Sequence, residues 1–227
     1  MRRKTMKNKH RKNFTITGLL VLSFLLFTCI VKTVDVKAIG PKGSSVGLAA
    51  LNQFVFQRLG VHLGWYAVTD WLGVAALLTA CGFALVGLTQ LLRRKSLLKV
   101  DGGILLLGAF YVAAAAVYVF FECVVVNYRP IILHTELEAS YPSSHTMLVI
   151  CIMSTAVMQF RRLLPEKKGL RIFLDGAAVL LIVVTVVGRL LSGVHWFTDI
   201  LAGVLLSSAL VMLYFSALTW LEEKVRR

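Results

Sequence analysis

The chain has 227 residues, of which 58% are hydrophobic and only 16% are charged, and its mean hydropathy is +0.78. Soluble globular domains carry about 25% charged residues, so this composition excludes an ordinary soluble enzyme and indicates one membrane-embedded unit. The net charge of +14 does not indicate a nucleic-acid binder, because the basic residues lie in short clusters between apolar segments and not on one soluble face.

Six apolar segments are long enough to cross a bilayer, which takes about 20 residues. We expect an all-α integral membrane protein with six transmembrane helices, at residues 14–31, 67–92, 102–126, 144–163, 172–191 and 196–220. They form one membrane domain at 14–220, between a basic arm at 1–13 and a tail at 221–227. The first segment could also be a signal peptide, but Lys37 in the cleavage-like sequence and the length of the apolar run favour an uncleaved anchor.

The segment 46–66, between the first two spans, has a different pattern. Leucine and valine recur at helical spacing, but Asn52, Gln53 and Arg58 interrupt them, so the segment is too polar to span. We expect a helix that lies in the membrane interface, with nearby aromatic residues at the level of the lipid headgroups. It forms either a packing lid over the bundle, which we favour, or one wall of a lateral lipid entrance.

The connections between the spans fall into two alternating classes. The arm, the segments 93–99 and 161–171, and the tail are basic. The other connections are poorer in lysine and arginine for their length. The positive-inside rule therefore predicts a plasma-membrane protein with both termini in the cytoplasm and with 32–66, 127–143 and 192–195 facing outward.

The four cysteines lie inside apolar segments, and no two of them form a CxxC pair. We expect small buried hydrophobic side chains at Cys29, Cys81, Cys123 and Cys151.

Polar residues interrupt the outward ends of the apolar segments. The third span ends in FFECVVVNYRP, where Glu122 and Arg129 are seven residues apart. Seven residues are close to two helical turns, so both side chains share a face if the helix continues that far. Pro130 then ends the helix, because it lacks an N–H donor.

The fourth span begins with YPSSHTM, in which Ser143 or Ser144 is a good N-cap and His145 lies in the first turn. The unpaired N–H groups of a first turn, together with the helix dipole, favour an anion at this position.

The fifth span ends and the sixth begins within GRLLSGVHWFTD. His195 and Asp199 are four residues apart, which puts them on one face of a helix. The carboxylate can then fix the tautomer of the imidazole and leave its other nitrogen electron-rich. The planar guanidinium of Arg189 suits phosphate oxygens.

Taken singly, a helix cap, a His–Asp pair and an interfacial arginine are commonly structural, but here they converge at one end of the bundle. Together they are the parts that phosphoryl transfer needs: donors for the equatorial oxygens, a nucleophile and a proton donor. A metal could also supply positive charge, but only HTELE (134–138) has ligand-like spacing. We interpret that stretch as a solvated loop.

These residues resemble the three motifs of the type 2 phosphatidic acid phosphatase (PAP2) superfamily of membrane phosphatases, which is related to vanadium haloperoxidases. The family pattern is lysine, six residues and Arg-Pro; then Pro-Ser-Gly-His; then Ser-Arg, five residues, histidine, three residues and aspartate. This chain has Glu122 and, six residues on, Arg129-Pro130; then Pro142-Ser143-Ser144-His145; then Gly188-Arg189, His195 and Asp199 at the family spacing.

The resemblance implies a helical PAP2-like bundle that hydrolyses a lipid mono- or pyrophosphate, such as phosphatidate, phosphatidylglycerol phosphate or undecaprenyl pyrophosphate. His195 would be the nucleophile, Asp199 would orient it, and His145 would protonate the leaving oxygen. The phosphate would be held by Arg129, Ser143, Ser144 and Arg189, with no metal and no other cofactor required. Alternatives are a lipid phosphotransferase and a non-catalytic carrier or binder of lipid phosphate.

Three positions depart from the family pattern. Ser144 replaces glycine and Gly188 replaces serine, and both changes are mild. Glu122 replaces lysine and puts an anion where the family has a phosphate-binding cation. Its carboxyl group could be kept protonated by burial, could pair with one of the arginines, or could meet a cationic group of the substrate.

Overall fold

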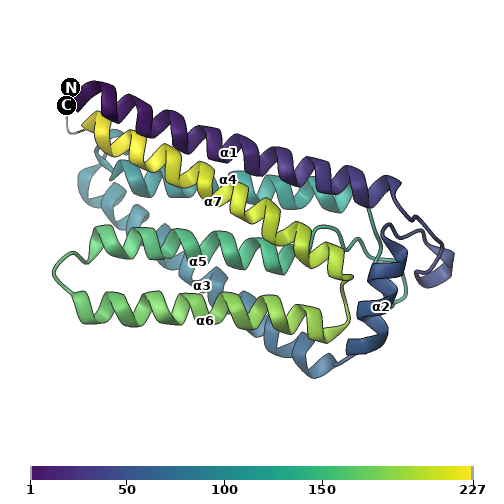
Figure 1. Ribbon diagram of the computed structural model, residues 1–227. Helices are drawn as coiled ribbons and strands as arrows, with labels where there is room; N and C mark the ends of the chain where they lie inside the picture. Colours follow the sequence, from purple (N-terminus) through teal and green to yellow (C-terminus); the bar gives the residue numbers. More distant parts are fainter. Residues whose placement is uncertain (1, 226–227) are drawn as a thin grey trace.

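A computed structural model describes residues 2–225, which form seven α-helices and two short 3-10 helices but no strand (Figure 1). In chain order they are α1 (Arg2–Thr33), η1 (Pro41–Gly43), α2 (Ala49–Leu59), α3 (Leu63–Arg94), η2 (Leu97–Lys99), α4 (Gly102–Cys123), α5 (Ser144–Leu163), α6 (Lys168–Ser192) and α7 (Phe197–Val225). Met1 of the predicted arm and residues 226–227 of the predicted tail lie outside the described residues.

Six helices, α1 and α3 to α7, are long and apolar enough to cross a membrane. The all-α class and the six spans predicted from the sequence are therefore confirmed, and the chain is a multi-pass membrane protein. Because the number of spans is even, the start of α1 and the end of α7 lie at the same end of the bundle, as Figure 1 shows. We call the opposite end, where α5 and α7 begin, the distal end.

The helix α5 lies at the centre of the bundle and contacts α3, α4, α6 and α7. The helix α1 runs alongside α7, so the first span packs as an integral part of the bundle (Figure 1). Large side chains fill the space between these helices, among them Phe24, Leu107, Phe110, Met147 and Tyr214. At its start, α4 is capped by Asp101, whose carboxylate accepts the N–H of Gly103 at 2.8 Å.

The third span ends earlier than predicted. The helix α4 ends at Cys123, where the N–H of Val124 still donates to the carbonyl of Phe120 at 2.8 Å, and the chain then leaves the helix. The following loop folds back on itself, because the N–H of Arg129 donates to the carbonyl of Glu138 at 3.0 Å. Glu122 and Arg129 therefore do not share a helical face. The helix ends seven residues before Pro130, so the proline is not what ends it.

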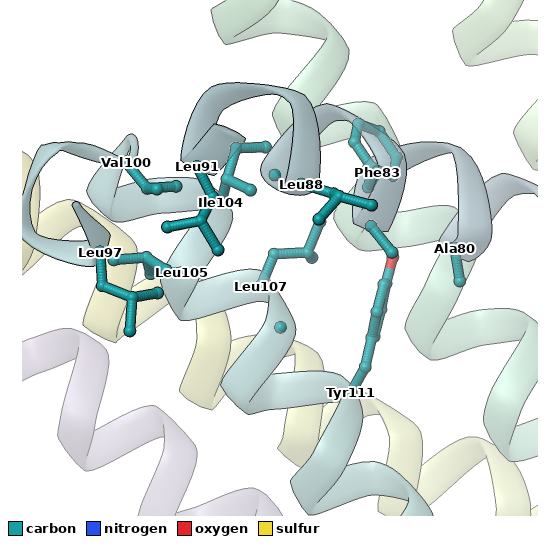
Figure 2. A pocket seen from close by; sticks show the side chains of 13 residues that line it. Ala80, Phe83, Leu88, Leu91, Leu97, Val100, Ile104, Leu105, Leu107 and Tyr111 are labelled. Carbon is teal, nitrogen blue, oxygen red and sulfur yellow. The ribbon is translucent and has the colours of Figure 1, made fainter. Parts of the chain in front are cut away.

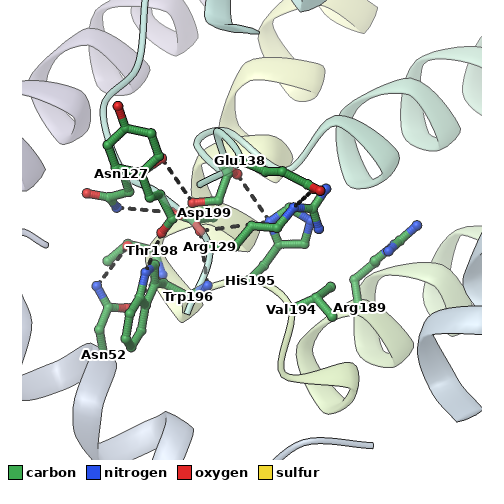
Figure 3. Close-up of polar contacts among 12 residues, drawn as sticks. Asn52, Asn127, Arg129, Glu138, Arg189, Val194, His195, Trp196, Thr198 and Asp199 are labelled. Atoms are coloured by element: carbon green, nitrogen blue, oxygen red, sulfur yellow. Dashed lines mark hydrogen bonds and ion pairs between the residues drawn. The ribbon is translucent and has the colours of Figure 1, made fainter. Parts of the chain in front are cut away.

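The predicted interfacial helix is α2, and it is fixed to the start of α7 by Asn52. The Nδ2 group of Asn52 donates to the Thr198 hydroxyl at 2.9 Å, and its Oδ1 atom accepts the Thr198 N–H at 3.1 Å (Figure 3). The side chain of Asn52 thus satisfies an N–H group in the first turn of α7 that has no partner within the helix. The helix α2 covers the distal end as a lid, while Phe54 on its other face is exposed.

All four cysteines are free thiols, but only Cys151 is buried. The prediction of buried side chains is wrong for Cys29, Cys81 and Cys123, which lie on the surface of the bundle. In a bundle of six spans, most helices turn one face to lipid, and a small apolar side chain fits there as well as in the core.

Candidate active site

The polar residues identified in the sequence gather at the distal end, although they belong to four different segments of the chain. The positive charges of Arg129 and Arg189 both act on His145 and on His195. The backbone N–H of Ser143 donates to the carbonyl of Asp199 at 3.0 Å, which ties the start of α5 to the start of α7. The structure therefore brings together the residues of all three motifs except Glu122.

His195 lies in the turn before α7, and not on that helix as its spacing from Asp199 predicted. The side chain is buried, and its Nδ1 atom lies 3.1 Å from the carbonyl oxygen of Ser140 and 3.8 Å from Oδ2 of Asp199. An N–H at Nδ1 that donates to this carbonyl leaves the lone pair of Nε2 free. Nε2 has no hydrogen-bond partner among the described residues.

The protonation state of His195 follows from its surroundings. Burial lowers the pKa of His195 below its ordinary value of 6.5, against the opposing effect of the nearby Asp199 carboxylate. The positive charges of Arg129 and Arg189 lower it further. His195 is therefore a neutral imidazole at neutral pH, which is the form that a nucleophile needs.

Asp199 is fully buried, and both of its carboxylate oxygens accept hydrogen bonds (Figure 3). Oδ2 accepts the backbone N–H of Trp196 at 3.0 Å, and Oδ1 accepts Nδ2 of Asn127 at 3.1 Å. The carboxylate is thereby fixed beside His195 while it also caps the first turn of α7. Sequence reasoning missed Asn127, because no local pattern distinguishes it within the loop.

Arg129 is held by an acidic residue from its own loop. Its Nε atom lies 2.9 Å from Oε2 of Glu138 (Figure 3). The other oxygen of Glu138 lies 2.6 Å from Nδ1 of His134. The interpretation of HTELE as a solvated loop is therefore wrong for Glu138, which positions a predicted phosphate ligand. The Nη1 atom of Arg129 has no partner within residues 2–225.

Ser143 is the N-cap residue of α5, but its hydroxyl caps no N–H group. This hydroxyl is buried and has no partner in the described part of the chain. Ser144 and His145 follow in the first turn and line a cavity. The start of α5 therefore presents free donors to the site, as an anion-binding helix end does.

Arg189 is fully buried on α6 and does not stand alone. Its Nη2 atom pairs with Asp70 of α3, and its guanidinium lies 4.9 Å from the ring centre of Tyr66. The Oδ1 atom of Asp70 also lies 3.2 Å from Nε2 of His145. Sequence reasoning missed Asp70, yet a carboxylate inside a predicted span is itself a sign of function.

A cavity of about 450 Å³ opens beside His145, between α3, α4 and α5. Its polar lining comes mainly from the early turns of α3 and α5, and the remainder is largely apolar, with residues such as Val74, Leu77, Leu148 and Ile152. Glu122 is exposed in the last turn of α4, next to Tyr118 at the cavity wall. Each arginine has another acidic partner, so pairing with Glu122 is not what holds either of them.

A second cavity, of about 230 Å³, lies further along α3 and α4 toward the end that carries the termini (Figure 2). Its lining is almost entirely aliphatic and aromatic, for example Leu88, Leu107 and Phe83. The hydroxyl of Tyr111, which also lines it, is 3.2 Å from that of Thr155. This cavity has no group that could bind a phosphate and is not the candidate site.

Six buried polar atoms of the motif residues have neither a hydrogen-bond nor an ion-pair partner in the part of the chain that the structure describes. They are Nη1 of Arg129, Oγ of Ser143, Nδ1 of His145, Nε and Nη1 of Arg189, and Nε2 of His195. Unpaired buried polar atoms are costly, and such a group is commonly completed by a ligand. A tetrahedral phosphate has the several acceptor oxygens that the donors of Arg129, Ser143 and Arg189 require.

The chain is similar to known proteins in part of its sequence and in its fold. Residues 122–223 match the sequence model of the PAP2 superfamily. The fold is similar to the crystal structure of a transmembrane PAP2-type phosphatidylglycerolphosphate phosphatase from Bacillus subtilis, with a TM-score of 0.64 and 19% identity, over 93% of this chain and 98% of that chain. Among curated proteins, none matches this sequence significantly. Residues 122–223 are therefore similar in sequence to the PAP2 superfamily, and the chain as a whole is similar in fold to that transmembrane PAP2-type structure.

Proposed function

We propose that this protein is a lipid phosphate phosphatase that acts without a metal ion and forms a phosphohistidine at His195. The observation that carries the proposal is a buried neutral imidazole with a free Nε2 atom in the field of two arginines. The PAP2 superfamily match supports phosphatase chemistry in general. The identity of the nucleophile rests on the geometry of the site.

In the first step, the lone pair of His195 Nε2 forms a bond to phosphorus as the bond between phosphorus and the lipid oxygen breaks. His145 gives a proton to the leaving oxygen, which would otherwise depart as an unstable alkoxide. The equatorial oxygens carry the negative charge of the transition state. Arg129, Arg189 and the hydroxyl of Ser143 supply donors for them, with Ser144 at the edge of the site.

In the second step, water attacks the phosphohistidine and the bond between nitrogen and phosphorus breaks. His145, now neutral, takes a proton from the attacking water, and inorganic phosphate leaves. His195 returns to its neutral form, with its Nδ1–H still directed at the carbonyl of Ser140 and near Asp199. The buried hydrogen bonds of Asp199 keep this geometry fixed through both steps.

A lipid substrate fits the cavity beside His145 better than a water-soluble phosphate ester does. The cavity joins a polar rim to a predominantly apolar lining, in a bundle that spans the membrane. The phosphate would lie at the distal end, and the first part of the lipid chain would lie between α3, α4 and α5. The substrate class is then a lipid mono- or pyrophosphate.

We place the site on the outer face of a plasma membrane with both termini in the cytoplasm. The basic connections 93–99 and 161–171 lie at the end that carries the termini, whereas the distal loops contain few lysines and arginines. The solved structure similar to this chain is named a phosphatidylglycerolphosphate phosphatase, so phosphatidylglycerol phosphate is the first substrate to test. Phosphatidate and undecaprenyl pyrophosphate follow.

The test uses purified protein in detergent, lipid phosphates labelled in the phosphoryl group, and the variant His195→Ala. We expect phosphate release by the wild type and none by the variant, together with a label on wild-type protein that is stable in alkali and lost in acid. His62→Ala is the matched control, because His62 is exposed at the start of α3. Its release should stay within about twofold of wild type.

Three outcomes would contradict the proposal. Unchanged release by His195→Ala would rule out the nucleophile. Binding of the lipid phosphate without release would indicate a carrier. Transfer of the label to an added lipid acceptor, with no inorganic phosphate formed, would indicate a phosphotransferase.

A further inference from the structure

The helix α3 brings a second carboxylate to the site, from outside the region that matches the PAP2 superfamily. Asp70 uses its Oδ1 atom both to pair with Nη2 of Arg189 and to approach Nε2 of His145 at 3.2 Å. Asp70 therefore stands beside His145 much as Asp199 stands beside His195, at 3.8 Å. Each of the two histidines has one ring nitrogen near a carboxylate. The other ring nitrogen of each has no hydrogen-bond partner among the described residues.

Two glycines fix the position of Asp70. A Cβ atom on Gly188 of α6 would lie 2.6 Å from Cγ2 of Thr69, the residue before Asp70. A Cβ atom on Gly73 of α3 would lie 3.1 Å from Cδ2 of His145. The absence of a side chain at both places lets α3 approach α5 and α6 closely. The close packing of these helices therefore lets Asp70 contact both Arg189 and His145. One of the two glycines, Gly188, is the residue that replaces the serine of the family pattern.

The geometry of His145 defines which nitrogen can reach a substrate. Nε2 faces Asp70, whereas Nδ1 is buried and has no partner among residues 2–225. A carboxylate accepts a hydrogen bond from Nε2–H, which leaves Nδ1 as the nitrogen that exchanges a proton with a ligand.

Charged side chains of both signs lie near His145. The positive charges of Arg129 and Arg189 both act on this imidazole. Asp70 is the acidic side chain in contact with it. Its charge offsets the two arginines when His145 holds the proton that it will donate.

We propose that Asp70 is a positioning residue that acts through His145 in the phosphatase reaction. Asp70 keeps the Nε2–H of His145 occupied, so that Nδ1 donates its proton to the leaving lipid oxygen as the phosphorus–oxygen bond breaks. In the second step, the same Nδ1 atom accepts a proton from the attacking water. This inference rests on the proposed function and names the residue that makes His145 a proton donor.

The test compares Asp70→Asn with the wild type on two substrates in single turnovers, with phosphohistidine formation as the measured rate. A lipid phosphate has an alkoxide leaving group that needs a proton, whereas p-nitrophenyl phosphate releases a stable anion that does not. We expect Asp70→Asn to slow the lipid reaction about 10- to 100-fold, the range for loss of a carboxylate that orients a histidine. The rate with p-nitrophenyl phosphate and the KM for lipid should stay near wild type.

Two further variants sharpen the comparison. Asp175→Asn is the matched control, because Asp175 pairs with Arg161 at 2.9 Å near the other end of α6 and its loss should leave both rates unchanged. Asp70→Glu keeps the charge and should restore part of the lipid rate. Adding Asp70→Asn to His145→Ala should cause no further loss, because the two residues act as a unit.

Equal losses on both substrates, or a large rise in KM, would show that Asp70 serves only to hold Arg189 and would overturn the inference. Wild-type rates, or a faster lipid reaction with tighter binding of inorganic phosphate, would overturn it as well. If Asp70→Asn does not fold, Asp70→Glu takes its place in the test. It must then slow the lipid reaction more than the reaction with p-nitrophenyl phosphate. A wild-type protein that releases no phosphate would refute the proposed function itself, and this inference with it.

Discussion

Replacing Asp199 with asparagine separates the structural task of this carboxylate from its task in catalysis. Both of its oxygens accept hydrogen bonds, one from Nδ2 of Asn127 at 3.1 Å and one from the N–H of Trp196 at 3.0 Å. Asparagine has only one acceptor oxygen, so its amide group must face one of these two donors. One buried donor is then left without a partner, at a cost of about 1–3 kcal/mol.

The reciprocal double variant Asn127→Asp with Asp199→Asn repairs this mismatch. The oxygen of the new asparagine accepts the Trp196 N–H, and its amide donates to the new aspartate at position 127. We expect the double variant to recover most of the stability that Asp199→Asn loses. Its carboxylate, however, is at position 127 and no longer at position 199, which contacts His195 at 3.8 Å. Phosphate release should therefore stay below that of the wild type in both variants, with a loss of up to about 10⁴-fold.

The assay measures thermal unfolding in detergent by circular dichroism, together with phosphate release by each variant. Asp175→Asn, which removes a carboxylate far from the site, serves as the control for lost charge. An unfolding midpoint of Asp199→Asn equal to that of the wild type would refute the hydrogen-bond argument. Recovery of phosphate release in the double variant would refute the requirement for a carboxylate beside His195.

Two further predictions concern charge at the site. Because burial lowers the pKa of His195 below 6.5, its neutral nucleophilic form persists under mildly acidic conditions, and kcat/KM should fall only as the pH drops below 6.5. A pH profile of phosphate release whose acidic limb has its midpoint above 6.5 would contradict this. Glu122→Lys should change phosphate release by less than about threefold, because Glu122 is exposed and both arginines have other acidic partners. A gain or loss of tenfold or more in the same assay would show that Glu122 contacts the substrate.

Much of the fold could be predicted from the sequence because hydropathy and length act locally. A run of apolar residues must form a helix in the bilayer to satisfy its own backbone, whatever its neighbours are. The number of spans and the side of the bundle that carries the motifs follow from this. The end of α4 could not be predicted in this way, because apolar residues continue past Cys123, where the helix ends, and the loop that follows pairs Arg129 with Glu138.

In the candidate site, too, some features could be predicted from the sequence and others could not. The sequence by itself determined which motif residues stand at one end of the bundle, since their spacing relative to the ends of the spans is a local property. Only the tertiary structure decided their partners: Asp70 for Arg189 and His145, Asn127 for Asp199, and Glu138 for Arg129. The physical reason is that a contact between helices depends on how each helix is rotated and how closely the backbones approach. Here that approach is set by the missing side chains of Gly73 and Gly188, which no hydropathy pattern reveals.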